Sequence, residues 1–195
     1  MRFHSLLVLL LCIACASTLA WHDPVVGCDG QVYPEPEVSP YVIPFPVGMT
    51  VETGLANCSE SFHGPNSPER YATDFDMPEG TVFTAARGGV VARLVEDSED
   101  EIGNWLHIDH DDDTSALYAH SPVGGIYVEV GDRVEPGDTL GIVGQSGQAG
   151  YPHLHFIVVK DPARWPFDPV PVSFRNADPG DVALRCHSTY TALSY

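Results

Sequence analysis

The stretch from residue 50 to residue 160 consists of short runs of β-branched and aromatic residues separated by glycine turns. No part of it has the apolar spacing of an amphipathic helix, in which every third or fourth residue is apolar. Short runs of this composition, bounded by turn residues, are typical of β-strands. We expect strands over residues 81–85, 89–96, 105–109, 116–120, 126–130, 139–143 and 153–159. The sequence therefore predicts an all-β fold with an antiparallel sheet.

Proline is frequent on both sides of this stretch, before Gly48 and after Asp161. Because proline lacks an N–H group and clashes with the preceding helical turn, both flanks are expected to be extended. The length of the chain suits one compact domain. We divide it into an export signal (1–20), a leader (21–48), a β-domain (49–160) and a C-terminal extension (161–195). The leader and the extension are expected to pack outside the domain.

The first segment has the pattern of an export signal. Arg2 precedes an apolar run over residues 6–16, and small residues then end at Ala20. The apolar run is too short to span a bilayer permanently. The pattern predicts a protein that is secreted or periplasmic after cleavage near Ala20, without a permanent membrane span. The alternative is a lipid anchor at Cys15, although Cys12 stands where such sites usually have leucine.

The charge of the chain excludes one class of partner. Lysine and arginine number 9 against 27 acidic residues, which gives a net charge of -18. Polyphosphate ligands are repelled by such a surface, so no nucleic acid is expected as a partner. The acidic run over residues 109–113 is expected to be a solvated turn, because it lacks the glycine and the distal glutamate of a calcium loop.

Cleavage of the signal leaves Cys28, Cys58 and Cys186. An oxidising compartment favours one disulfide and one remaining thiol. The spacing contains no CxxC pair, which argues against a cysteine zinc site. The sequence leaves open which two cysteines pair.

His153 and His155 flank Leu154 in an expected strand. Residues two apart in a strand face the same side, so both imidazoles point one way. This pair suits a metal site in which one ring binds the ion and the other acts beside it. Taken alone, the pair is equally consistent with two surface histidines on an edge strand.

Several blocks of sequence occur together with this pair. They are YATDFDMPEGT (71–81), LYAH (117–120), VEVGDRVEPGDTLGIVGQSG (128–147) and GYPHLHF (150–156). In content and order they resemble the lysostaphin/LytM family of zinc peptidases. The resemblance covers roughly residues 50–160. It implies an antiparallel sheet domain with a substrate groove, of the duplicated hybrid motif kind seen in LytM-type peptidases.

The resemblance also implies roles for single residues. Asp74 and His155 correspond to zinc ligands, and His120 and His153 to catalytic imidazoles that do not bind the ion. The common family spacing puts the remaining ligand at Arg70, whose guanidinium has no lone pair to offer. We expect His63 to take this role, because the loop between His63 and Asp74 can close at little entropic cost.

With one Zn²⁺ per chain, three protein ligands leave the fourth position open, as in catalytic zinc sites. The resemblance implies an endopeptidase that hydrolyses peptide cross-links or bridges of bacterial peptidoglycan by metal-activated water. Its partners are then peptidoglycan stem or bridge peptides, and we expect a monomer. Of the two catalytic imidazoles, His153 is favoured as the general base, because it shares a strand face with His155.

The main alternative is a catalytically inactive peptidoglycan-binding or regulatory module of the same fold. A biotinyl or lipoyl carrier is excluded because the only lysine, Lys160, ends the histidine strand instead of standing at a tight turn. The sequence has no HExxH motif, and the residues around Ser146 lack the closing glycine of a nucleophile elbow. His107 and His110 are expected to be solvated. For Tyr118 and Tyr151, the sequence leaves open whether they line the substrate groove or pack in the core.

Overall fold

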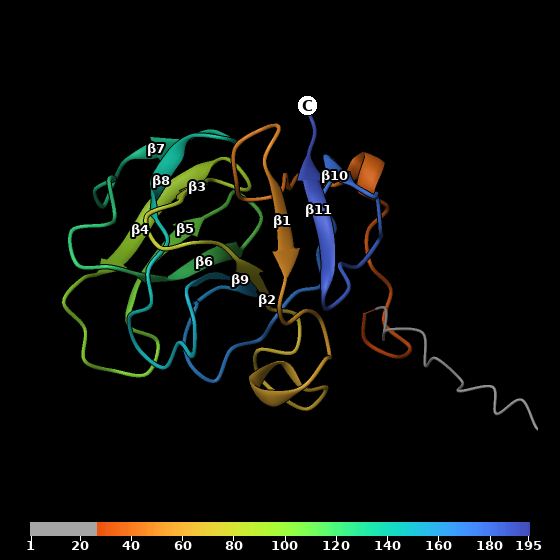
Figure 1. Ribbon diagram of the computed structural model, residues 1–195, viewed down its shortest axis with the longest axis horizontal. Helices are drawn as coiled ribbons and strands as arrows, with labels where there is room; N and C mark the ends of the chain where they lie inside the picture. The colour runs from red at the N-terminus through yellow and green to blue at the C-terminus, as the bar shows by residue number, and fades with distance from the viewer. Residues whose placement is uncertain (1–26) are drawn as a thin grey trace, which may run out of the picture.

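The computed structural model describes residues 27–195, and the expected export signal and the Cys15 alternative lie outside this range. The fold is nearly all antiparallel β-structure, as the sequence predicts (Figure 1). A nine-stranded sheet has the order β10-β11-β1-β2-β9-β6-β5-β4-β7. Its strands are β1 (Thr50–Thr53), β2 (Thr73–Asp76), β4 (Gly89–Val95), β5 (Asn104–Asp109), β6 (Thr114–Ser121), β7 (Arg133–Val134), β9 (His153–Lys160), β10 (Ala177–Asp178) and β11 (Ser188–Ala192).

A two-stranded sheet pairs β3 (Val82–Thr84) with β8 (Thr139–Ile142). Helical structure in the described part of the chain is limited to two single 3₁₀ turns, η1 (Pro36–Val38) and η2 (Ser61–His63). η1 departs from the expectation of a fully extended leader, and Pro36 stands in its first turn, where the missing N–H costs nothing. No helix among the described residues is long and apolar enough to cross a membrane.

The strand expected over residues 126–130 is wrong. Ile126 forms a single bridge to Gly141, and the residues after it leave the sheet. Ile126 is buried and Val128 packs against the core, but Tyr127 and Val130 are exposed, so the β-branched and aromatic run does not continue as a strand. Gly131, with φ of 100°, then turns the chain into β7.

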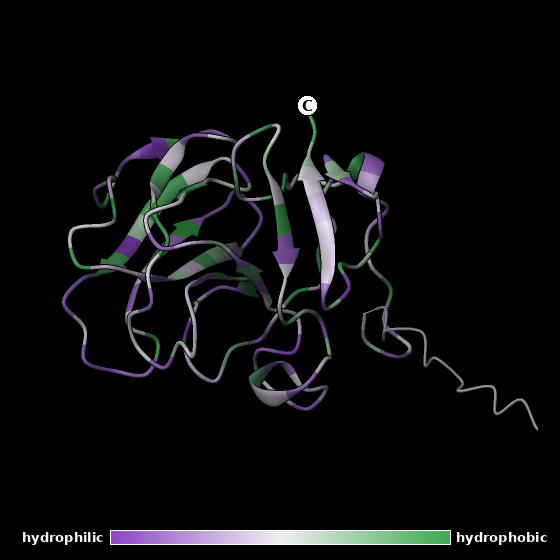
Figure 2. Cartoon of the chain, in the orientation of Figure 1, coloured by the Kyte–Doolittle hydropathy of each residue, from purple (hydrophilic) through white to green (hydrophobic). Residues whose placement is uncertain are grey.

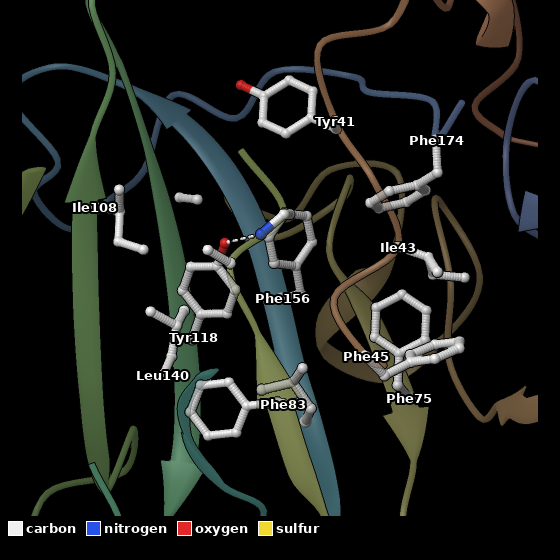
Figure 3. Packing of buried hydrophobic residues seen from close by; sticks show 14 of the residues in the cluster. Tyr41, Ile43, Phe45, Phe75, Phe83, Ile108, Tyr118, Leu140, Phe156 and Phe174 are labelled. Carbon is white, nitrogen blue, oxygen red and sulfur yellow. Dashed lines mark hydrogen bonds between the residues drawn. The ribbon is translucent and has the colours of Figure 1, made fainter. Parts of the chain in front are cut away.

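The core lies on one face of the large sheet and is dominated by aromatic rings, among them Phe75, Phe83, Tyr118 and Phe156 (Figure 3). Tyr118, one of the two tyrosines left open by the sequence, is fully buried there, and its hydroxyl accepts a hydrogen bond from the Ala86 N–H. In Figure 2 hydrophobic colours fall on central strands such as β5 and β9, whereas β7 is hydrophilic and β11 is close to neutral.

The leader and the C-terminal extension both contribute to this core, contrary to the expectation that they lie outside it. Ile43 and Phe45 of the leader and Phe174 of the extension are buried in it (Figure 3). The extension also adds β10 and β11 to the sheet, where β11 pairs with β1. Both segments therefore cover apolar surface that the central strands alone would leave exposed.

Within residues 27–195 one disulfide joins Cys28 of the leader to Cys58, which follows β1, and Cys186 has no partner there. The expectation of one disulfide with a remaining thiol is confirmed. The bridge attaches the leader to the segment that leads into η2.

The two faces of β9 have different environments. Leu154, Phe156 and Val158 point into the aromatic core. On the other face, Ile157 joins a small second cluster that includes Phe167 of the extension. His153 and His155 belong to this second face by the alternation of the strand.

Candidate metal centre

The register of β2 and β9 brings a carboxylate against an imidazole. In this antiparallel pair Asp74 lies opposite His155, and Asp76 lies opposite His153. Directly opposed residues of a sheet point to the same face, so the four side chains gather on one side. His155 Nδ1 lies 2.8 Å from Asp74 Oδ1, and both residues are buried.

His63 reaches the same carboxylate from the loop between β1 and β2. It stands at the end of η2, its side chain is 2% exposed, and its Nε2 is 3.5 Å from Asp74 Oδ1. One donor atom each from His63, Asp74 and His155 lie within 4.8 Å of one another. Arg70, which occupies the position of the common family ligand, stacks over the Tyr71 ring at 4.8 Å. The loop therefore brings the His63 imidazole next to Asp74, whereas the Arg70 guanidinium packs on Tyr71.

His120 and His153 complete the cluster. His120 comes from the end of β6 with a left-handed backbone, φ 73°, which is uncommon for a residue with a side chain. Its ring centroid is 4.6 Å from that of His153 and 5.7 Å from that of His155. All the site residues suggested by the sequence are thus within one group.

Backbone carbonyls determine the tautomers of these two rings. His153 Nδ1 lies 2.8 Å from the Tyr151 oxygen, and His120 Nδ1 lies 2.9 Å from the Ser146 oxygen. A carbonyl oxygen can only accept, so Nδ1 of each neutral ring carries the proton and Nε2 keeps the lone pair. His153 Nε2 lies 3.7 Å from Asp74 Oδ1. Its lone pair is therefore directed towards the cluster.

The cluster shifts the ionisation of its members. Burial raises the pKa of Asp74, but the hydrogen bond from His155 and the charges of the surrounding imidazoles lower it to about 2. Burial lowers the pKa of His63 to about 4, against the opposing effect of Asp74. Burial, reinforced by the neighbouring imidazoles, lowers the pKa of His120 to about 3. At neutral pH Asp74 is thus ionised, and the rings of His63 and His120 are neutral with a free lone pair.

His155 differs from the others. Burial lowers its pKa, but the hydrogen bond and charge of Asp74, together with the charge of Glu69, outweigh this effect and raise it. Its Nε2 is buried and has no hydrogen-bond partner among the residues that the structure describes. The ring thus lies between two carboxylates, with one of its nitrogens unpaired.

The donor set fits a divalent cation of the zinc type. Donors at ~2.0–2.1 Å from a tetrahedral ion lie roughly 3.4 Å apart. In the cluster, His155 Nδ1 and His63 Nε2 lie 2.8 Å and 3.5 Å from Asp74 Oδ1. Two imidazoles with one carboxylate form the three-ligand set of a catalytic zinc. His120, His153 and His155 form a second triad within 4.8 Å. The set with Asp74 fits a cation better because it supplies a negative charge.

Tyr151 and Asp76 lie beside the cluster. Tyr151, the other tyrosine left open, is 39% exposed, and its ring centroid is 4.9 Å from that of His153. A Cβ at Gly54 would collide with the Tyr151 hydroxyl and the Asp76 carboxylate, so a larger residue there requires these two side chains to shift. Asp76 was missed from the sequence, although its place two residues after Asp74 put it on the same strand face.

The expectation that His107 and His110 are solvated is wrong, since they are 3% and 9% exposed. His107 packs against Trp105 with ring centroids 4.7 Å apart. His110 packs against Tyr41 of the leader at 5.5 Å and hydrogen-bonds to Thr114 at 3.0 Å. For His110, the covering ring comes from a segment distant in the sequence, which strand alternation alone does not reveal.

Comparison with known proteins places this geometry in context. The profile described as peptidase family M23 matches residues 69–169. An uncharacterized metalloprotease of Buchnera aphidicola is 34% identical over 93 residues, which cover 48% of this chain and 23% of that protein. The peptidoglycan DD-endopeptidase ShyC of Vibrio cholerae serotype O1 is 34% identical over 84 residues, which cover 43% of this chain and 18% of that protein. The chain thus spans about a fifth of the length of these relatives.

Among solved structures, a zinc-containing peptidase from Vibrio cholerae superposes with a TM-score of 0.52 at 24% identity. The superposition covers 68% of this chain and 39% of that one, and it shows a common fold. The profile match includes Asp74, His120, His153 and His155, whereas His63 precedes it. The case for His63 therefore rests on its position beside Asp74.

Proposed function

The chain belongs to peptidase family M23, and from this premise we propose that it is a zinc-dependent endopeptidase that hydrolyses peptide cross-links or bridges of bacterial peptidoglycan. The observation that carries the proposal is the meeting of Asp74 with His63 and His155, beside two further imidazoles whose Nε2 atoms are free. This arrangement combines a place for a cation with groups that can move protons.

His63, Asp74 and His155 are the proposed ligands. A zinc ion, when bound, activates water for attack and polarises the scissile carbonyl. Asp74 is ionised at neutral pH because its pKa is lowered to about 2, so it can balance part of the charge of a cation. The set leaves room for one further ligand in a tetrahedral arrangement, as a catalytic site requires.

His153 is proposed to accept the proton of the attacking water at Nε2 and to return it to the leaving amine. The carbonyl of Tyr151 holds its Nδ1, which keeps the Nε2 lone pair directed towards Asp74. His120 is arranged in the same way against Ser146, so its neutral ring is also an acceptor. His153 is favoured as the base because it lies on the same face of β9 as His155.

The proposed substrate is a peptidoglycan stem or bridge peptide. Support comes from the peptidoglycan DD-endopeptidase among the relatives and from the partly exposed Tyr151 beside His153, where an extended peptide could be held. The alternative, an inactive binding or regulatory module of this fold, is disfavoured because all five side chains are present and gathered. A module that had lost activity would not be expected to keep the two imidazoles beyond the ligands.

Digestion of purified sacculi tests the proposal. The zinc-loaded protein should release peptide fragments that mass spectrometry identifies as products of cross-link or bridge cleavage. Chelation should stop the release and added zinc should restore it. Absence of any fragment at every zinc concentration, from protein that binds zinc, would favour the inactive module instead.

A further inference from the structure

His155 contacts a different carboxylate through each ring nitrogen. Nδ1 lies 2.8 Å from Asp74 Oδ1, on the side of the cluster. Nε2 lies 3.7 Å from Glu69 Oε1 and is buried, with no hydrogen-bond partner in the described part of the chain. A buried ring nitrogen left unpaired costs free energy, so a nearby carboxylate that can accept from it is significant.

Glu69 is held in place by its own backbone. Its N–H donates to the Ser67 hydroxyl at 3.0 Å, and its carbonyl accepts from the Ala72 N–H at 2.8 Å. Its side chain is 14% exposed, which is unusual for a carboxylate without strong hydrogen bonds. Its ion-pair partner among the described residues is His155. The carboxylate is therefore directed at the ring instead of into solvent.

We propose that Glu69 is a positioning residue of the metal centre, whose carboxylate accepts the Nε2 proton of His155 and so presents the Nδ1 lone pair to the ion. The inference rests on the proposed function, because it assumes that His155 binds a metal. Only the tautomer with its proton on Nε2 leaves Nδ1 free to coordinate. A carboxylate behind a ligand histidine fixes that tautomer and the ring orientation, and it raises the basicity of the ligand.

The present separation is longer than the roughly 2.7–3.2 Å of a hydrogen bond. Closing it requires the two atoms to approach by roughly 0.5–1 Å. Both groups are already desolvated, with side-chain exposures of 14% and 8%, so closing the contact requires little further loss of water. A charge-assisted contact in such surroundings is stronger than the same contact in water.

The proposal gives the loop between β1 and β2 a second role. This loop carries His63 near its middle and Glu69 a few residues before β2 begins. It therefore supplies both a ligand and the carboxylate that supports another ligand on β9. The longer spacing between His63 and Asp74 allows both contributions from one segment.

Zinc affinity measured on the full chain tests the proposal. Wild type, Glu69→Gln, Glu69→Ala and the control Glu60→Gln are stripped of metal and titrated with zinc against a chromogenic chelator. Glu60 lies on the same loop, is exposed and makes no side-chain capping bond. Its replacement therefore removes the same charge as Glu69→Gln without removing a buried carboxylate. We expect Glu69→Ala to bind zinc about 10- to 100-fold more weakly. Glu69→Gln should lose less, because its amide oxygen still accepts, and Glu60→Gln should match wild type.

Two further measurements separate positioning from simple structural damage. The melting temperature of each metal-free variant should equal that of metal-free wild type. In the zinc-loaded wild type, ¹⁵N NMR should show the His155 proton on Nε2, and this signal should weaken in Glu69→Ala. A variant series with unchanged zinc affinity, or with metal-free melting temperatures that fall in parallel with affinity, overturns the role of Glu69. Failure of wild type to bind zinc overturns the proposed function itself.

Discussion

Asp74 and His155 are direct partners across the antiparallel pair of β2 and β9, and their side chains meet at 2.8 Å. The centre is therefore built on the strand register itself. A slip of one residue would turn His155 to the opposite face of the sheet. The aromatic core prevents such a slip, because it would bring Leu154 and Phe156 out of the buried cluster.

The first prediction concerns the origin of the ligand in the loop. His63→Ala should abolish tight zinc binding, because it removes a donor atom 3.5 Å from Asp74 Oδ1. Arg70→Ala should keep the metal, since a guanidinium offers no lone pair. Elemental analysis after dialysis measures both. Full zinc occupancy in the His63 variant would show that the three-imidazole group of His120, His153 and His155 holds the ion instead.

A second prediction follows from the contact at Gly54. An added Cβ collides with Tyr151 and Asp76, so Gly54→Ala should destabilise the protein by roughly 1–3 kcal/mol, the usual effect of overpacking. Gly150→Ala is the matched control, because nothing lies within 4 Å of a Cβ there and its backbone is not left-handed. Urea denaturation of both variants measures the difference. Equal stability of the two would mean that Tyr151 moves aside freely.

A third prediction concerns pH. His120 in the folded, metal-free protein has a pKa of about 3, whereas an unfolded histidine titrates near ~6.5. Between these values the unfolded state takes up a proton that the folded state does not, so stability rises with pH. The contribution of His120 is complete above about pH 6.5 and is lost as the pH falls towards about 3.

His120→Asn removes this titration while tolerating the left-handed backbone, since asparagine adopts positive φ more readily than most residues. Metal-free wild type should therefore lose stability more steeply than the variant on acidification, by on the order of 1 kcal/mol per pH unit. Urea denaturation at several pH values from about 7 to 5 measures both slopes. Parallel curves for the two proteins would contradict the lowered pKa.

The sequence predicted the fold class and most of the central strands, because glycine turns and β-branched runs are local signals. Local signals do not identify strands such as β11, whose residues Ser188–Ala192 become a strand by pairing with β1. The burial of Phe45 and His110 likewise depends on segments that meet only in the fold. For the same reason the pairing of Cys28 with Cys58 could not be read in advance.

The sequence identified the proposed ligands and catalytic histidines, but it did not identify Glu69, the residue proposed to position one of the ligands. The alternation of His153 and His155 and the block around Asp74 identify residues that the structure gathers, because strand geometry has a fixed period. Glu69 gave no such signal. It lies in an irregular loop, and its direction is determined by hydrogen bonds to Ser67 and Ala72.

The last prediction separates two histidines on one strand face. If His155 binds zinc and His153 moves protons, His155→Ala should lose both metal and activity, because two remaining protein ligands hold zinc poorly. His153→Ala should keep stoichiometric zinc and its melting temperature, since its Nδ1 is engaged with the Tyr151 carbonyl. Its cleavage of sacculi should still fall by about 10² to 10⁴, the usual contribution of a positioned general base. Zinc content and fragment release are measured on wild type and both variants. Loss of zinc from the His153 variant with retention in the His155 variant would reverse the two roles, because it would make His153 the ligand.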